Sequence, residues 1–325
     1  MTRVLFRAKS GASVGEGHVV RSRAVAEAVA ERGGEVAFVV DEPAGAERLS
    51  AEGFEAWAAC DFPGWTGLPA QAAWIDGFAD WTEELRALRR RGTRTILVEN
   101  RTPAREWCDR LVYPALHWCP DAWDRVHAAR VLGGADWIPL RRGVRTALPA
   151  LQRDVDVLIT FGGSDPKRLT ERTLAALPPG RGHVAVSVGV HMEARRPELE
   201  RLAEGTGAER VTLLPTGADL DPWMSRGRVA LTALGTTLYE LAHLDVPALV
   251  LANWPDDRGP LEHYGVHGPH LPLGLADELD DAALATALSA ALGELDHTPP
   301  PAFPDLAAGA NRLADLLLTS VARVA

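Results

Sequence analysis

RVLFRAKSGASVGEGHVVRSRAV, residues 3–25, joins a short apolar run to a glycine-containing loop and the start of a helical pattern. A strand, a loop and a helix in this order are typical of a nucleotide-binding α/β unit. The loop is not a standard phosphate-binding fingerprint, because Gly11, Gly15 and Gly17 miss the G-x-G-x-x-G spacing and no P-loop lysine follows. A histidine, His18, stands where the helix should begin. The stretch therefore predicts an α/β fold and singles out His18 for a chemical role.

Short apolar runs alternate with amphipathic helical patterns along the rest of the chain, as in a parallel sheet covered by crossover helices. In the first half the predicted strands are 3–8, 35–40, 72–76, 95–99 and 109–114, and the predicted helices are 20–34 and 80–92. The stretch 140–154 has no clean period and is typical of a crossing between domains. After it we predict strands within 155–163, 183–189, 210–215, 228–235 and 247–254, and helices at 164–177 and 236–244.

The length of the chain favours two domains of ordinary size. The predicted fold class is α/β, with two Rossmann-like domains facing each other across a cleft. We predict a first domain at 1–145, a second at 146–305, and a C-terminal helix at 306–325 that packs back toward the first domain. Ligands of such folds bind at the carboxyl ends of the strands, where the glycine-rich turns of this sequence fall.

Charge and composition exclude several classes of function. The 325 residues carry a formal net charge of −10, with 46% hydrophobic and 24% charged residues, which is the balance of a folded globular enzyme. A negative field repels nucleic acid and anionic membranes, whereas helix N-termini still bind a small anion. Cys60, Cys108 and Cys119 form no C-x-x-C pair, and no apolar stretch reaches the length of a membrane span. We therefore expect a complete, reduced, cytoplasmic chain.

Two turns in the second half are candidate phosphate sites. The first, FGGSDP at 161–166, follows a predicted strand and has Ser164 or Asp165 near a helix N-cap and Pro166 early in the helix. Taken alone, this pattern is more typical of an ordinary tight turn between a strand and a helix.

The second turn, LGTTLYE at 234–240, carries more information. Gly235 permits a close backbone approach, and Thr236 and Thr237 offer hydroxyl and N–H groups at a helix start. Glu240 follows one turn later. Two interpretations of Glu240 stay open: a carboxylate that accepts hydrogen bonds from ribose hydroxyls, or a solvated helix residue.

Several segments together resemble a known family. The segments 6–21, 158–177, 233–251 and 305–317 are similar, in order and spacing, to the UDP-deoxysugar hydrolases of pseudaminic acid biosynthesis and the related spore-coat polysaccharide proteins. Residues 131–142 resemble the family's segment that leads into the second domain. Both groups have the glycosyltransferase-B architecture. Four ordered motifs are far more specific than any one of them.

The resemblance implies roles for individual residues. His18 would activate the water that attacks the anomeric carbon while the nucleoside diphosphate leaves. Residues implied on the nucleotide are Gly162, Gly163 and Ser164 lining the cleft, Gly235, Thr236 and Thr237 around the diphosphate, and Glu240 on the ribose. Residues expected on the sugar and phosphate side are Arg7, Lys9, Gly15, Gly17, Arg21, Asp76, Asn253 and Asp257.

This chemistry needs neither a metal nor a cofactor. A neutral imidazole suits proton abstraction at neutral pH, and helix N-termini stabilise a leaving diphosphate. The alternative for His18 is a helix N-cap or a packed loop histidine. The expected partner is a small-molecule sugar nucleotide, with no nucleic acid and no membrane span, and the oligomeric state is left open.

The sequence also departs from the family pattern. Lys9 replaces an acidic residue, Phe78 replaces a tyrosine after Asp76 and Gly77, and 98–100 read Val-Glu-Asn where the family has Ile-Asp-Asp. The family's Asn-Gln pair is missing. Counting forward from the strand places it at 253–254, and counting back from the terminal Leu-Gly of that segment places it at 257–258.

His263, His267 and His270 raise a metal hypothesis by their close spacing. Gly265, Gly268 and Pro269 are expected to interrupt any helix that would align them, so loop histidines facing solvent are the favoured interpretation.

Three hypotheses of function follow. The first is hydrolysis of a UDP-linked sugar with inversion, the second is transfer of the sugar to an acceptor hydroxyl, and the third is a nucleotide-sugar-binding protein without catalysis.

Overall fold

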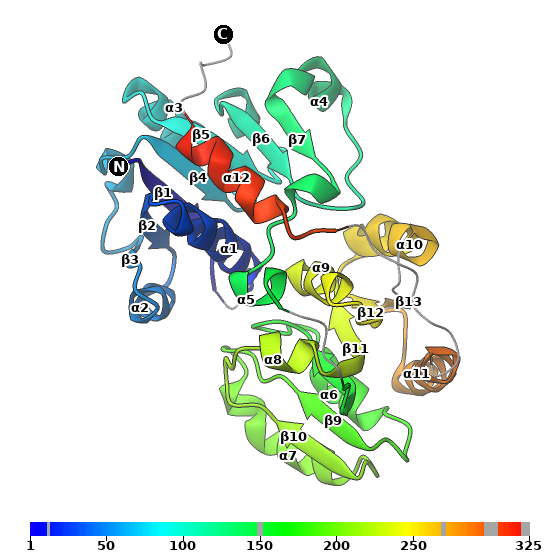
Figure 1. The fold of residues 1–325 in the computed structure, drawn as a ribbon. Helices are drawn as coiled ribbons and strands as arrows, with labels where there is room; N and C mark the ends of the chain where they lie inside the picture. The colour runs from blue at the N-terminus through cyan, green and yellow to red at the C-terminus, as the bar shows by residue number, and fades with distance from the viewer. Residues whose placement is uncertain (12–13, 148–151, 268–270, 296–304, 320–325) are drawn as a thin grey trace. The chain divides into compact units, whose positions relative to one another are not determined.

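The structure is a computed structural model that describes residues 1–11, 14–147, 152–267, 271–295 and 305–319. The chain divides into two compact units. The first unit comprises Met1–Arg145 and Leu306–Ala325, and the second comprises Thr146–Asp305. Each unit is described by itself below (Figure 1).

The first unit is built on a parallel sheet whose described strands follow the order β3-β2-β1-β4-β5-β6-β7. The strands are β1 Arg3–Ala8, β2 Glu35–Val40, β3 Glu55–Ala58, β4 Ala72–Asp76, β5 Arg94–Val98, β6 Arg110–Tyr113 and β7 Val131–Gly133. The strand order reverses between β1 and β4, which makes their carboxyl ends the switch point where such sheets bind ligands.

Helices bury both faces of this sheet. Phe6 and Trp74 pack in one apolar cluster with residues of α1 and α12, whereas Leu5 and Ile75, their neighbours along the strands, pack in another with α3. This alternation follows from the two-residue period of a strand. The helices are α1 Gly17–Glu31, α2 Pro43–Ala51, α3 Thr82–Arg90, α4 Ala122–Val126, α5 Arg142–Arg145 and α12 Gly309–Leu318.

The C-terminal helix α12 belongs to the first unit and lies along α1 (Figure 1). Leu313 and Leu317 share a buried cluster with Val29 of α1. Gly309, the first residue of α12, lies directly against the backbone of Ile138. A Cβ on Gly309 would lie 1.9 Å from the carbonyl oxygen of Ile138, so only glycine fits at this position. This close approach fixes where the helix docks.

The second unit repeats the plan with the order β10-β9-β8-β11-β12-β13, again parallel. Its strands are β8 Val155–Thr160, β9 His183–Val186, β10 Arg210–Leu213, β11 Gly227–Ala233, β12 Ala248–Ala252 and β13 Leu271–Leu275. Its helices are α6 Leu169–Ala175, α7 Arg196–Glu204, α8 Asp221–Met224, α9 Thr236–His243, α10 Arg258–His267 and α11 Asp281–Leu295. Two parallel sheets with crossover helices confirm the predicted α/β class, and the switch point of this sheet lies between β8 and β11.

One predicted helix start is wrong. The helix after the FGGSDP turn begins at Leu169, because Asp165 and Arg168 adopt φ of 42° and 54° in the left-handed region. The Asp165 carboxylate caps the helix from outside by accepting hydrogen bonds from the backbone N–H groups of Leu169 and Thr170, each at 2.8 Å. Pro166 therefore lies in the turn.

The expectation about Gly265 is also wrong, since α10 runs through it to His267. His270 lies outside the described residues. Across the described part of the chain, every helix is too short or too polar to cross a membrane.

Candidate functional site

His18 lies at the switch point of the first sheet, as the second residue of α1. Glu16 occupies the N-cap position, so the interpretation of His18 as the helix cap is wrong. The imidazole is 6% exposed. Its neighbours are the residues that end β4 and begin the following loop, because β4 pairs directly with β1.

Asp76, the last residue of β4, holds the His18 ring. Its Oδ1 atom lies 2.7 Å from His18 Nδ1, and the carboxylate is fully buried. An ionised carboxylate only accepts hydrogen bonds, so Nδ1 carries the proton and Nε2 keeps its lone pair. The pairing gives the imidazole the tautomer and orientation of a general base.

Arg21 completes the buried cluster one turn further along α1. Its Nε and Nη2 atoms donate to the two oxygens of Asp76 at 2.6 and 2.7 Å, and its Nη1 atom pairs with Glu99. Glu99 follows β5 with φ of 45°, a left-handed conformation that non-glycine residues seldom adopt. The Nη2 atom of Arg21 also lies 3.1 Å from His18 Nδ1, so Arg21 contacts both the ring and the two carboxylates behind it.

Asp76 and Arg21 hold one another ionised. Burial alone would raise the pKa of the Asp76 carboxyl, but the positive charge of Arg21 and the hydrogen bonds from Arg21 and His18 keep that pKa below its ordinary value. Burial alone would lower the pKa of Arg21, yet Asp76 and Glu99 keep it above its ordinary value. Asp76 is therefore an anion that positions His18.

Arg7 and Lys9 lie beside this cluster at the end of β1. Both pair with Asp41, Arg7 through Nη2 and Lys9 with its Nζ 3.7 Å from Oδ2. Both cations also lie over the Trp81 ring, at 5.0 and 5.5 Å from its centroid. The positive charge that Lys9 brings in place of an acidic residue is therefore partly balanced by Asp41, the residue that follows β2.

The loop before α1 carries Gly15 and Gly17. Gly15 has φ of 82°, which a side chain would strain, and a Cβ on Gly17 would meet no atom within 4 Å. Space beside Gly17, at the first turn of α1, leaves room for an anion near the helix N-terminus.

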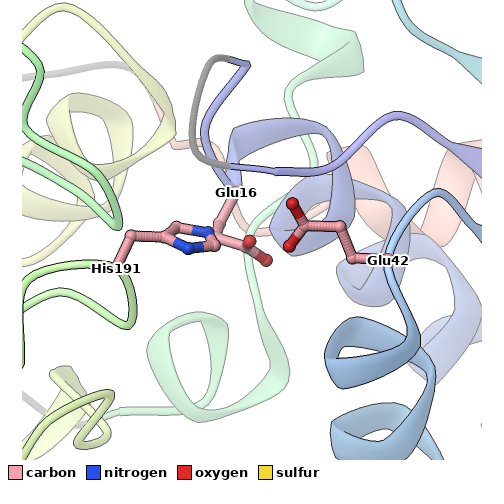
Figure 2. A group of neighbouring side chains, drawn as sticks. All are labelled: Glu16, Glu42 and His191. Carbon is pink, nitrogen blue, oxygen red and sulfur yellow. The ribbon is translucent and has the colours of Figure 1, made fainter.

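Two acidic side chains stand close together next to this loop. A carboxylate oxygen of Glu16 and one of Glu42 lie within 4.8 Å of each other (Figure 2). Arg48 donates to Glu16 at 2.8 Å. His191, also drawn there, belongs to the second unit, so the group is not assigned as a metal site. The expectation that no metal takes part stays a prediction.

The GGSD turn of the second unit follows β8. Gly162 has φ of 83°, and the turn packs against Gly189, where a Cβ would lie 2.4 Å from the carbonyl oxygens of both Gly162 and Gly163. The His191 N–H donates to Gly163 at 3.0 Å. Gly162 is exposed and Ser164 half-buried, so the turn presents its backbone to solvent at the end of the strand.

The LGTTLYE turn follows β11, the strand next to β8. Gly235 is the N-cap of α9, in extended backbone with open space around its Cβ position. Thr236 and Thr237 form the first turn and are half-buried. Glu240 is only 2% exposed, so its interpretation as a solvated helix residue is wrong. Glu240 is therefore a buried carboxylate one turn into α9.

Asn253 and Asp257, the two candidates for the position of the missing Asn-Gln pair, have different surroundings. Asp257 Oδ2 accepts from the Trp254 N–H at 2.9 Å and so closes the turn after β12. Asn253 Oδ1 is buried and has no hydrogen-bond partner among the described residues. Asn253 therefore keeps a buried amide oxygen that could accept a hydrogen bond, and the choice between the two candidates stays a prediction.

Of the three closely spaced histidines of the second unit, only His263 has a described side chain. Among the described residues, no group of metal-ligating side chains includes His263.

Sequence reasoning missed the relation among His18, Arg21, Asp76 and Glu99. It expected Arg21 and Asp76 on the sugar side and gave Glu99 no role. Their separations of 58 residues for His18 and Asp76 and 78 residues for Arg21 and Glu99 leave no local signal. A signal existed in the strand pattern, since Asp76 and Glu99 both stand at the carboxyl ends of adjacent strands.

Comparison with known proteins shows similarity to a protein of polysaccharide biosynthesis. No protein-family profile matches the chain. It is 28% identical over 170 residues to the spore coat polysaccharide biosynthesis protein SpsG of Bacillus subtilis (strain 168). The matched stretch covers 49% of this chain and 48%, about half, of the relative's length.

Solved structures are similar over nearly the whole chain. The spinosyn rhamnosyltransferase SpnG, complexed with spinosyn aglycone, has a TM-score of 0.62 and 15% identity, with 97% of this chain and 96% of that one covered. UGT89C1 of Arabidopsis thaliana, complexed with UDP, has a TM-score of 0.61 and 14% identity, with 98% and 95% covered. At this identity the likeness shows the fold, which is the glycosyltransferase-B architecture of two Rossmann-like units.

Proposed function

We propose that this chain is an enzyme that uses a nucleotide sugar, and that it transfers the sugar from a UDP-linked donor to an acceptor hydroxyl with His18 as the base. Transferases among the similar structures favour transfer over hydrolysis. The observation that carries the proposal is the 2.7 Å contact between His18 Nδ1 and the buried Asp76 carboxylate. It leaves Nε2 as the basic atom at the switch point of the sheet.

The reaction follows from this geometry. His18 Nε2 accepts the proton of the acceptor hydroxyl while its oxygen bonds to the anomeric carbon. The bond from that carbon to the diphosphate oxygen breaks, and its electron pair leaves with the nucleoside diphosphate. Asp76 stabilises the imidazolium that forms, and Arg21 keeps Asp76 ionised.

The nucleotide half of the proposal rests on the second unit. Backbone N–H groups at the start of α9 and in the GGSD turn suit a diphosphate, and Glu240 suits the ribose hydroxyls. Asn253 Oδ1 is proposed to accept a hydrogen bond from the sugar.

Hydrolysis is the second candidate, because the G-x-G-H-x-x-R loop resembles that of the UDP-deoxysugar hydrolases. In that reaction water replaces the acceptor and the same atoms take part. The two reactions differ only in the nucleophile, so a product assay separates them.

The test measures nucleoside diphosphate release from a panel of sugar nucleotides, with and without acceptor alcohols. His18→Ala is expected to lower the rate by at least about 100-fold, the usual contribution of a general base. His127→Ala, in the same unit but outside the cluster, is the matched control and should leave the rate unchanged. Full activity in His18→Ala would exclude the mechanism. Tight UDP binding without turnover by the wild type would instead identify a binding protein.

A further inference from the structure

Phe78 is an exposed aromatic side chain beside the base. Its ring is 66% exposed, and its edge-to-face contact with the His18 ring has a centroid distance of 4.9 Å. Among the described residues, the other large hydrophobic side chains in this exposure class are Met1, Val14, Val126 and Trp254. An exposed hydrophobic side chain is ordinary on a protein surface, but one in ring contact with a base at a switch point adjoins the reacting atoms.

Hydrogen bonds from buried side chains hold the backbone around Phe78. Asn100, which is 1% exposed, donates through Nδ2 to the carbonyl oxygens of Gly77 and Ala79 at 3.0 and 2.8 Å. Trp81 Nε1 donates to the Gly77 carbonyl at 3.1 Å. These bonds hold the Gly77–Phe78 peptide group and the carbonyl group of Ala79, one residue after Phe78, so the exposed ring is carried by an anchored turn.

Gly77 sets the direction of this turn. Its φ is 152°, and a Cβ there would lie 2.3 Å from Lys9 Cγ. Only a glycine lets the chain pass over the Lys9 side chain and place the next residue beside His18. The position of the Phe78 ring is therefore built by its neighbours.

We propose that Phe78 is a specificity-determining residue that contacts the acceptor and favours an alcohol on an apolar or aromatic skeleton over water. This inference rests on the proposed transfer reaction. Phenylalanine has no hydroxyl to hold a water molecule near His18, and its open face gains free energy by covering apolar surface. The acceptor oxygen then loses its proton to His18 Nε2 as it bonds to the anomeric carbon, and the nucleoside diphosphate leaves with the electron pair of the broken bond.

The experiment compares full-length wild type with Phe78→Ala, Phe78→Leu and Phe78→Tyr, and with Val126→Ala as the control. Val126 is 80% exposed and lies on α4 in the same unit. Nucleoside diphosphate release is measured with 2-naphthol, with methyl glucoside and with no acceptor. We expect Phe78→Ala to raise the KM for 2-naphthol about tenfold, which corresponds to the upper end of the free energy of one aromatic contact. The rate of nucleoside diphosphate release without acceptor should equal that of wild type or exceed it.

The other variants sharpen the result. Phe78→Leu should recover most of the affinity for 2-naphthol, and Phe78→Tyr should raise acceptor-free release relative to transfer. If Phe78 only supported His18, transfer and acceptor-free release would fall together in Phe78→Ala, and the inference would be wrong. The same conclusion follows if Phe78→Ala behaves as Val126→Ala does. A wild type that releases no nucleoside diphosphate from any donor would overturn the proposed function, and this inference with it.

Discussion

The two switch points of the molecule consist of different chemical groups. Around His18 in the first unit, charged side chains contact one another, and Asp76 is fully buried between His18 and Arg21. At the end of β8 and β11 in the second unit, the turns are glycine backbone, and α9 begins at Gly235 without a capping side chain. The first region holds a ring by a hydrogen bond to a buried carboxylate, and the second presents peptide N–H groups.

This difference matches the tasks proposed for the two regions. A base needs one tautomer in one orientation, which a buried carboxylate supplies. A diphosphate needs several donors at close range, which backbone supplies where no Cβ intervenes. Substitution of a charged side chain should therefore harm catalysis in the first unit, whereas addition of a methyl group should harm binding in the second.

The largest effect is expected from Asp76→Asn. The amide no longer selects the Nδ1–H tautomer of His18, so kcat should fall on the order of 10³-fold or more. Asp109→Asn is the matched control, since Asp109 is a carboxylate of the same unit that accepts from the Thr95 N–H at 2.8 Å, away from His18. It should change thermal stability with kcat unchanged. A kcat for Asp76→Asn within tenfold of wild type, in a folded variant, would contradict the role of Asp76.

A smaller effect is expected from Gly189→Ala in the second unit. The new methyl group would lie 2.4 Å from two carbonyl oxygens of the GGSD turn, so the turn must shift, at a cost of about 1–3 kcal/mol in the free energy of unfolding. Calorimetry should also show weaker UDP binding.

Gly235→Ala is the control for Gly189→Ala, because its Cβ meets nothing within 4 Å and its backbone is extended. Its free energy of unfolding should stay within about 0.5 kcal/mol of wild type. Weaker UDP binding in Gly235→Ala at unchanged stability would locate the diphosphate at this turn. Equal UDP affinity in both variants and wild type would remove the second unit's turns from the site.

The smallest expected effect is the pH dependence of the melting temperature. The pKa of Asp76 is lowered in the folded chain, so its stabilising contribution is present above the unfolded value of about 3.9 and is lost as the pH falls below it. The melting temperature of wild type should therefore approach that of Asp76→Asn as the pH is lowered from 6 to 3. A difference between the two that stays constant over this range would contradict an ionised, buried Asp76.

Local patterns predicted most of the fold. The strands at 3–8, 35–40 and 72–76 were predicted at their observed bounds, because each is a short apolar run between polar turns. The start of α6 was missed because the helix is capped by Asp165, three residues before the N-cap position. This arrangement requires the left-handed conformations of Asp165 and Arg168. Gly265 stayed helical because intrinsic propensity is weaker than tertiary context.

The site was predicted only in part, for a physical reason. His18 could be identified from its residue type and its position after a predicted strand. The sequence alone does not show which carboxylate contacts its ring. Asp76 and Glu99 reach Arg21 only after β1, β4 and β5 align as neighbours. The contacts of Asp76 with His18 and Arg21 are therefore visible only in the folded chain, and its predicted place on the sugar side stays a prediction.

The docking of α12 on α1 has a consequence for synthesis on the ribosome. Residues 146–305 of the second unit are translated between the bulk of the first unit and the helix that covers its α1 face. At roughly 5–20 residues per second, the apolar face of α1 waits on the order of ten seconds or more for its partner. The apolar face of α1 is therefore uncovered for this time, and the cluster that it shares with Leu313 and Leu317 is complete only when α12 leaves the exit tunnel.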